Sequence, residues 1–490
     1  MMLGMNREKS LDAMRNREEV FDFCVVGGGA SGLGVALDAV VRGYSVCLLE
    51  QNDFGKGTSS RSTKLVHGGV RYLKQGNVSL VREALRERGR LVKNAPHLVS
   101  ELGFVIPVYR WTDGPFYGVG LKVYDALAGK LGMGASRWLS REETLKELPT
   151  VKQEGLRGGV RYFDGQFDDA RLLVDLAYTS SLQGAHLANY TKCVGLLEEN
   201  GKVVGVQVRD EENGEEFEVK AKAVVNATGI FVDELRRGEP EMMTVSQGAH
   251  VVLPREFLPG NSALMIPKTS DGRVLFAVPW KEVVLVGTTD TPRDEKLLEP
   301  KPLEEELEFI LSHTEKFLGR RPKPEEVRSV YAGLRPLVRP PNSGGKTSSI
   351  SRNHTIVRSE NGLVTIAGGK WTTYRKMAED LVDRVEEFEG WEKRSCGTEE
   401  LLIETSGADS VEAFVEKEMA RGVEDVLARR TRSLVEDARG AAAAADEVAR
   451  QMAKSLGKEL PWAEDQVSQF EKLAEGWVVP HSNGWSELAE

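Results

Sequence analysis

Residues 21–50 begin with an apolar run, continue with a segment of helical periodicity and end with a second apolar run. The first run, Phe21–Val26, suits a parallel strand that is buried on both faces. The segment Ser31–Arg42 is expected to form a helix, and Ser45–Leu49 a second strand. This order of strand, helix and strand predicts a parallel β–α–β unit near the N-terminus.

Glycines occupy the turn between the first strand and the helix. Gly27, Gly29 and Gly32 form the pattern G-x-G-x-x-G, which permits a tight turn, close approach of the backbone to a pyrophosphate and close helix–strand packing. Glu50 follows Gly32 by 18 residues, near the spacing of about 20 at which a carboxylate accepts hydrogen bonds from ribose hydroxyls. A glycine-rich turn without a nucleotide is the alternative, but strand, helix and acid all fall in place. We therefore predict a dinucleotide-binding unit.

The remainder of the chain alternates between strand and helix patterns, so the fold class is expected to be α/β. Helices are predicted at 80–91, 168–184, 303–318 and 372–388, and strands at 186–208, 217–225 and within 244–290. From about residue 400 the sequence is charged, helical in periodicity and rich in alanine, with a helix-favouring run at Ala441–Ala445. We expect a discontinuous nucleotide-binding domain (20–95, 155–240 and 325–395), a β-sheet-rich substrate domain (96–154 and 241–324) and a C-terminal helical domain (400–490).

Composition and charge limit the classes of partner. The net charge of −10 argues against a uniformly basic face for nucleic acid. The four cysteines have no zinc-like spacing, and Cys24 and Cys47 fall inside predicted buried strands, so we expect small core residues and no metal site. There is no run of 18 apolar residues and no signal-peptide core. We expect a cytoplasmic protein that can attach peripherally to the inner face of the cell membrane.

Three later segments combine glycine with cations and hydroxyls. The loop 58–64 carries five hydroxyls and two cations, and a His-Gly-Gly stretch follows it at 67–69. The segments 331–337 and 367–375 likewise place a cation beside glycine. Guanidinium groups hold phosphate or carboxylate with paired hydrogen bonds, although a single arginine is more often a solvated surface charge. The cations expected to converge on one anion are Arg71, Arg335, Arg352 and Lys370.

His250 lies in the apolar segment SQGAHVVLP. A lone histidine in such a strand is more often a core residue whose hydrogen bonds are satisfied. As a general base it would need to reach a substrate hydroxyl and to have a suitable pKa. Both interpretations stay open from the residues alone.

Eight strings in this chain resemble the FAD-dependent glycerol-3-phosphate dehydrogenases and the related α-glycerophosphate oxidases. In chain order they are VVGGGASGLGVALDAVVRG, GTSSRSTKLVHGGVRYL, FDDARL, VVNATG, VLVGTTD, YAGLRPL, GGKWTTYRKMAE and LARRT. The resemblance implies a Rossmann-like FAD-binding domain of the glutathione-reductase/D-amino-acid-oxidase type, a β-sheet-rich substrate domain and a C-terminal helical cap. A long insertion typical of some oxidases, between the Arg335 and Gly368 regions, is absent, which favours a dehydrogenase.

Carried onto this sequence, the resemblance assigns roles residue by residue. His250, together with Arg335, is the expected proton acceptor, and His67 is the second candidate, at the flavin. The implied substrate-binding residues are Arg71, Tyr72, Arg335, Arg352 and Lys370. The implied FAD-binding residues are Gly27, Gly29, Gly32, Glu50, Thr58, Ser59, Ser60, Lys64, Leu65, Gly229, Gly369 and Lys370.

The activity implied by this resemblance is oxidation of sn-glycerol 3-phosphate to dihydroxyacetone phosphate, with FAD as cofactor and quinone as electron acceptor. Dioxygen is the alternative acceptor, and the chain is also compatible with a homodimer. Three rivals remain at this point: an amine or 2-hydroxy-acid oxidase of the same fold, a non-catalytic flavoprotein, and an NAD-dependent dehydrogenase.

Overall fold

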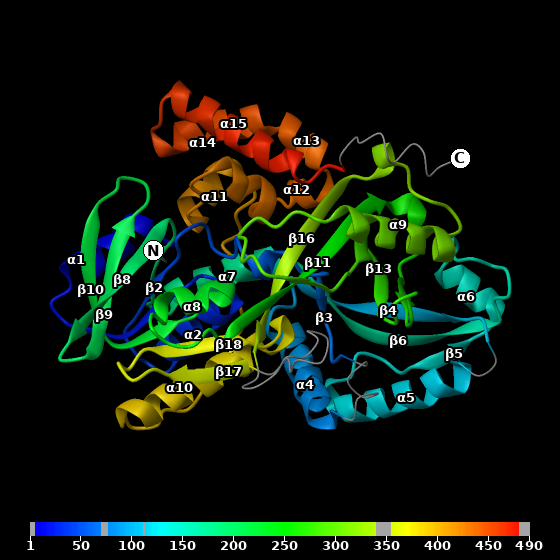
Figure 1. The fold of residues 1–490 in the computed structure, drawn as a ribbon, viewed down its shortest axis with the longest axis horizontal. Coiled ribbons are helices and arrows are strands. Elements are labelled where there is room, and N and C mark those ends of the chain that lie inside the picture. Colours follow the sequence, from blue (N-terminus) through cyan, green and yellow to red (C-terminus); the bar gives the residue numbers. More distant parts are fainter. Residues whose placement is uncertain (1–4, 70–76, 111–112, 340–353, 480–490) are drawn as a thin grey trace.

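The computed structural model describes residues 5–69, 77–110, 113–339 and 354–479. Within these ranges the strands form two main sheets, which lie beside each other along the long axis of the molecule (Figure 1). The helices before residue 400 are α1 (Arg7–Asn16), α2 (Ala30–Val41), α4 (Val78–Asn94), α5 (Asp113–Ala128), α6 (Arg141–Glu147), α7 (Asp169–Leu182), α8 (Val232–Leu235), α9 (Glu304–Leu318) and α10 (Tyr374–Glu389).

The first sheet has a parallel centre, with the strand order β17-β18-β10-β1-β2-β7. Only β17 runs antiparallel within this series, and the hairpin β8–β9 extends the sheet from β10. Its strands are β1 (Phe21–Val26), β2 (Val46–Leu49), β7 (His186–Ala188), β8 (Thr191–Glu199), β9 (Lys202–Asp210), β10 (Glu216–Asn226), β17 (His354–Arg358) and β18 (Val364–Gly368). Because β1, β2, β10 and β18 are parallel, their carboxyl ends meet at one edge, where open α/β sheets bind ligands.

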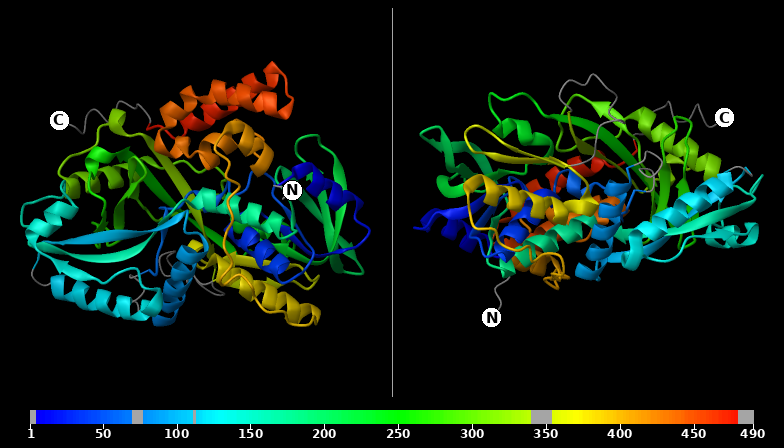
Figure 2. Two further views of the ribbon diagram at one scale, coloured as in Figure 1. Left: turned by 180° about the vertical axis from the view of Figure 1, so that it is seen from behind. Right: turned by 90° about the horizontal axis from the view of Figure 1, so that it is seen from below.

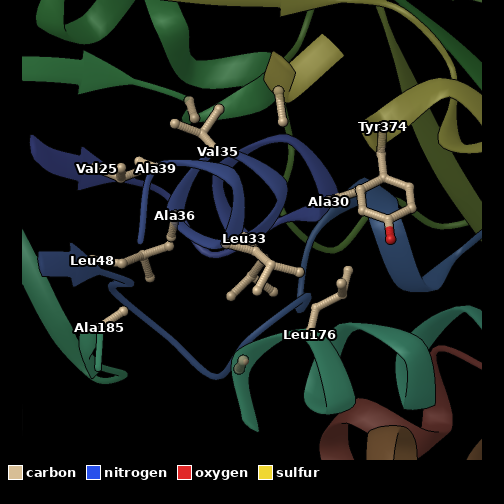
Figure 3. Close-up of a cluster of buried hydrophobic side chains, with 14 of the residues drawn as sticks. Val25, Ala30, Leu33, Val35, Ala36, Ala39, Leu48, Leu176, Ala185 and Tyr374 are labelled. Carbon is tan, nitrogen blue, oxygen red and sulfur yellow. The ribbon is translucent and has the colours of Figure 1, made fainter. Parts of the chain in front are cut away.

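Helix α2 forms the centre of the core that supports this edge. Leu33, Val35 and Ala36 of α2 are fully buried, and α2 lies between the strands β1 and β2 and the helices α7 and α10 (Figure 3). The expected β–α–β unit is therefore present, with ends within two residues of the predicted ones. Cys24 and Cys47 are neighbours in register on β1 and β2, and both are buried free thiols, as expected.

The second sheet is larger and mostly antiparallel, with the order β15-β11-β14-β13-β12-β4-β6-β3. The strand β16 pairs with β11, and β5 pairs with β6. Its strands are β3 (Leu65–Val66), β4 (Val99–Val108), β5 (Arg137–Leu139), β6 (Gly158–Phe167), β11 (Met243–Pro254), β12 (Ala263–Ile266), β13 (Leu275–Trp280), β14 (Val283–Gly287), β15 (Thr291–Arg293) and β16 (Ser329–Val338).

Three strands of this sheet, β3, β6 and β16, come from segments that the expected boundaries assign to the nucleotide-binding domain. The strand β6 pairs with β4 from Val99↔Phe167 to Val108↔Gly158, and β16 pairs with β11 from Met243↔Val338 to Val252↔Ser329. The long antiparallel ladders satisfy the backbone hydrogen bonds of both strands. The second sheet therefore takes strands from both expected domains, and the division of the chain into domains stays a prediction.

The C-terminal module is helical, as expected, and covers the second sheet near β16 (Figures 1 and 2). It consists of α11 (Val411–Glu418), a π-helix (Asp425–Arg430), α12 (Ser433–Glu436), α13 (Ala438–Ala443), α14 (Ala445–Leu456) and α15 (Leu460–Glu475). Its apolar side chains share one buried cluster with Leu65 and Tyr331. The Ala441–Ala445 run contains a helix boundary at Ala444, which is the C-cap of α13 and the N-cap of α14. Among the described residues, no helix has the length and apolar character needed to cross a membrane.

A substitution at Gly32 tests the close packing of helix α2 against the end of strand β1. A Cβ at Gly32 would lie 1.8 Å from the carbonyl oxygen of Gly27, whereas a Cβ at Gly120 in α5 would contact nothing within 4 Å. We expect Gly32→Ala to lower the unfolding free energy by about 1–3 kcal/mol through overpacking. The matched control Gly120→Ala should be neutral or stabilising by up to about 1 kcal/mol, because alanine favours helix. Denaturant unfolding measures both, and equal effects would contradict the packing.

Candidate active site

A groove opens at the carboxyl edge of the parallel sheet, beside the glycine turn. Gly27 has a φ of +111°, in the region that favours glycine, and a Cβ at Gly28 would lie 2.8 Å from the Cβ of Glu50. Gly29 is the N-cap of α2, so the positive end of the helix dipole lies at the groove. Of the predicted FAD-binding residues, those that line the groove are Gly27, Gly29, Glu50, Thr58, Ser59 and Gly229.

Glu50 is held in place at the end of β2 by two backbone donors. Its carboxylate oxygens accept hydrogen bonds from the N–H groups of Gly28 (2.6 Å) and Asn52 (2.8 Å). Burial raises the pKa of Glu50, while these two hydrogen bonds oppose the shift. The carboxylate, the glycine turn and the helix N-terminus together match what the ribose and diphosphate of FAD require.

The loop 58–64 connects the groove to the two other glycine-framed segments. The Thr58 hydroxyl donates to the carbonyl of Leu334 on β16 (2.7 Å), and the indole N–H of Trp371 donates to the carbonyl of Ser59 (2.7 Å). Ser59 Oγ in turn accepts from the N–H of Ala30 in the first turn of α2 (3.0 Å). The three segments that the sequence singled out therefore do meet in space.

Lys64 has its side chain buried below the loop and away from the groove lining. Its Nζ lies 2.7 Å from Oδ2 of Asp169 and donates to the carbonyl of Ser60 (2.8 Å). Burial lowers the pKa of Lys64 to about 7, although the neighbouring Asp169 favours the charged form. The prediction placed Lys64 and Leu65 at the flavin through their backbone, and Leu65 begins β3 with a buried side chain.

His250 is buried on β11, where its ring stacks on Tyr331 of β16 at a centroid distance of 4.6 Å. Its Nε2 lies 2.8 Å from the hydroxyl oxygen of Thr63. Within the described part of the chain, Nδ1 has no hydrogen-bond partner. Burial holds the pKa of His250 well below 6.5, and the charges of Lys64 and Arg335 lower it further. The imidazole is therefore neutral at pH 7 and able to accept a proton.

Arg335 lies on β16 near His250, with its guanidinium held by the β14–β15 connection. It donates to the hydroxyl of Thr288 (2.9 Å) and the carbonyl of Thr289 (2.9 Å), and it lies 3.4 Å from the Asp290 carboxylate. The side chain keeps 23% of its surface exposed, so these contacts orient the guanidinium without burying it.

The remaining predicted residues divide into two groups. His67 is close to the segment 368–375, because its N–H donates to Thr372 Oγ1 (3.2 Å). Gly369 has a φ of +83°, and a Cβ there would lie 2.4 Å from the sulfur of Met377, so the position favours glycine. Lys370 follows it as the N-cap of the 3₁₀ turn Trp371–Thr373. The predicted substrate-binding residues Arg71, Tyr72 and Arg352 lie outside the described residues.

Sequence reasoning missed a set of buried charges behind the site. Asp169 lies at the start of α7 and binds both Lys64 and Arg432, and Asp53 binds Arg429 and Arg430. All of these side chains are almost fully buried. Of these charged residues, Asp169, Arg429 and Arg430 lie in the strings FDDARL and LARRT. The sequence alone, however, does not show which residues more than 250 positions apart bind each other.

Two family models match the chain. The model for FAD dependent oxidoreductases matches residues 22–375, and the model for the C-terminal domain of alpha-glycerophosphate oxidase matches residues 407–467. The first match contains every element that lines the groove, and the second contains the π-helix and Arg432. Both the expected fold class and the expected cofactor are confirmed by these matches.

Individual relatives carry related names. The chain is 44% identical over 405 residues to a probable mitochondrial glycerol-3-phosphate dehydrogenase of Caenorhabditis elegans, covering 79% of this chain and 56% of the relative. It is 44% identical to the human mitochondrial glycerol-3-phosphate dehydrogenase over 400 residues, covering 77% of this chain and 54% of that relative. The chain thus spans about half the length of the curated relatives it matches.

Among solved structures, the fold is similar to the glycerol-3-phosphate dehydrogenase from Bacillus halodurans complexed with FAD. The TM-score is 0.80 at 28% identity, covering 99% of this chain and 100% of that chain. The groove, the glycine turn and the family match all point to the same cofactor. The chain belongs to the family of FAD-dependent oxidoreductases, and FAD is its cofactor.

Proposed function

We propose that this protein oxidises sn-glycerol 3-phosphate to dihydroxyacetone phosphate. The observation that carries the proposal is the placement of a neutral, buried His250 on β11 near the cationic Arg335 on the adjacent strand β16. A proton acceptor beside an anion-binding group is what oxidation of a hydroxyl in a phosphoester requires. The names of the C. elegans, human and B. halodurans relatives support the same substrate.

In this proposal each side chain has a defined task. Arg335 holds the substrate phosphate, and Lys370 adds positive charge nearby; Arg71, Tyr72 and Arg352 are proposed as further substrate contacts. His250 accepts the C2 hydroxyl proton at Nδ1, because Nε2 is engaged by Thr63. FAD, when bound, supplies the acceptor for the hydride that leaves C2. His67 is a second candidate near the cofactor.

Quinone is the proposed final electron acceptor, and dioxygen is the alternative. A quinone acceptor would place the protein at a membrane surface, which agrees with the expected peripheral attachment. The uncharged imidazole of His250 and the cofactor groove are compatible with either acceptor, so the two acceptors are separated by experiment.

Substrate identity is tested by anaerobic addition of glycerol 3-phosphate to the FAD-loaded protein. We expect the absorbance of oxidised flavin to disappear within one turnover. In the proposed site the phosphate of glycerol 3-phosphate binds Arg335 while its C2 hydroxyl faces the base His250. Glycine and lactate serve as comparison substrates for the rival oxidases of the same fold. Reduction by either of these, with none by glycerol 3-phosphate, would reject the proposal. Reoxidation by a quinone analogue or by air then identifies the acceptor.

The role of His250 is tested by His250→Ala in stopped-flow reduction of the flavin. Loss of a general base should slow reduction by about 10²–10⁴-fold. The wild-type rate should stay constant as pH falls through 6.5 and decline only well below it, since burial and two nearby cations depress the pKa of His250. The variant should lack this acid limb. An unchanged reduction rate at equal FAD content would remove His250 from this role.

The role of Arg335 is tested by Arg335→Ala in steady-state kinetics. A charged hydrogen bond contributes about 1.5–3 kcal/mol, so the KM for glycerol 3-phosphate should rise about 10–100-fold while FAD content is kept. Arg328→Ala is the matched control, because Arg328 precedes β16 but its side chain is half exposed. Loss of FAD with unchanged substrate affinity would show that Arg335 serves the cofactor instead.

A further inference from the structure

Three arginines of the C-terminal module bind the loops that form the cofactor site. The π-helix contributes Arg429 and Arg430, and Arg432 follows it. These three side chains are at most 3% exposed. Among the described residues, the groove lining itself ends at Leu334 and includes no part of the C-terminal module. These arginines therefore act on the site only through the loops that they bind.

The first contact is at Asp53, in the loop that follows Glu50. The carboxylate of Asp53 accepts from Arg429 Nε (2.6 Å) and Arg430 (2.9 Å), and the pKa of Asp53 is lowered to about 2 because these charges outweigh its burial. The same loop carries Gly55, Lys56 and Gly57, which line the groove. Lys56 is bound in turn by Glu424 at 2.8 Å.

The second contact is at Asp169, below the loop 58–64. Arg432 donates to Oδ1 of Asp169 (2.8 Å), while Oδ2 accepts from the N–H of Ser62 (3.0 Å) and from Lys64 Nζ (2.7 Å). Between Ser62 and Lys64 lies Thr63, whose hydroxyl is 2.8 Å from Nε2 of His250. The backbone of Ser62 and the side chain of Lys64, on the two sides of Thr63, are therefore both bound to Asp169, and this holds the hydroxyl that contacts the imidazole.

Two residues of this second contact have backbone conformations that residues other than glycine disfavour. Lys64 has a φ of +61° and Arg432 a φ of +72°, in the left-handed region that residues other than glycine rarely adopt. Such conformations persist where the surroundings determine them, and they cluster at functional sites. Both residues bind the same carboxylate of Asp169.

Buried charges make the two loops and the module depend on each other. A buried carboxylate is stable only while its cationic partners are in place, and removing one partner leaves an uncompensated charge. We propose that the C-terminal module completes the cofactor site, with Arg430 and Arg432 as positioning residues that hold the loops 51–57 and 58–64 in the FAD-binding arrangement. This proposal rests on FAD as the cofactor and is independent of the substrate.

The test compares Arg430→Gln and Arg432→Gln with the control Arg421→Gln. Arg421 also joins the module to the nucleotide-binding part of the chain, through two hydrogen bonds of 2.5 and 2.6 Å to Glu212, but neither residue lines the groove. Quenching of flavin fluorescence measures the Kd of FAD for each apoprotein. We expect the Kd to rise about tenfold or more in the two test variants and less than about twofold in the control.

Two further readouts separate positioning from general stability. Visible circular dichroism of the bound FAD should change in Arg432→Gln and be restored, at least in part, by Arg432→Lys, which keeps the charge. Thermal unfolding of the apoproteins shows whether the three Gln variants are destabilised alike. If the Kd and the dichroism of the test variants match those of Arg421→Gln, the module is only a structural cap and the proposal is wrong.

A measurement on the wild-type protein decides the question should the Gln variants fail to fold. Coupling between two sites is reciprocal, so FAD should protect the π-helix if the π-helix supports FAD binding. Hydrogen exchange with and without FAD is expected to show slower exchange in 51–64 and also in 425–432. Protection confined to 51–64, with no change in 425–432, would overturn the proposal.

Discussion

The site depends on one tight backbone contact, between Gly32 in the first turn of α2 and the carbonyl of Gly27 at the end of β1. No side chain fits between them, so the helix starts directly at the carboxyl edge of the parallel sheet. That contact places the helix N-terminus at Gly29 beside the Glu50 carboxylate on one groove, and the N–H of Gly28 donates to this carboxylate. The register of β1 with β2 and β10 brings the other groove-lining loops to the same edge.

Charge is distributed unevenly around this groove. Behind it, Asp53 and Asp169 are each bound by buried cations, and burying these charges carries a large desolvation penalty. Beside it, His250 is kept neutral by the same burial and by the charges of Lys64 and Arg335. The buried ion pairs thus hold the loops, while the carboxylate of Asp169 opposes the effect of the two cations on the pKa of His250.

Local signals in the sequence predicted the parts of the fold that depend on neighbouring residues. The turn at Gly27, the helix α2, the burial of Cys24 and Cys47 and the helical C-terminus all follow from spacing and periodicity. Pairing between distant segments was not predictable, so the membership of β3, β6 and β16 in the second sheet was missed. The contact of Arg432 with Asp169 was missed for the same reason, because 263 residues separate the partners. The roles assigned to the individual site residues all stay predictions, from His250 and Arg335 to the FAD-binding glycines, and those of Arg71, Tyr72 and Arg352 concern residues outside the described part of the chain.

The most direct measurement is a crystal structure of the FAD-loaded protein with dihydroxyacetone phosphate. We expect the diphosphate of FAD beside Gly29 and its ribose at Glu50, with the ligand phosphate at Arg335 and the C2 oxygen facing His250. FAD lying outside the groove, or a ligand whose phosphate is remote from Arg335 and whose C2 oxygen is remote from His250, would contradict the proposed site.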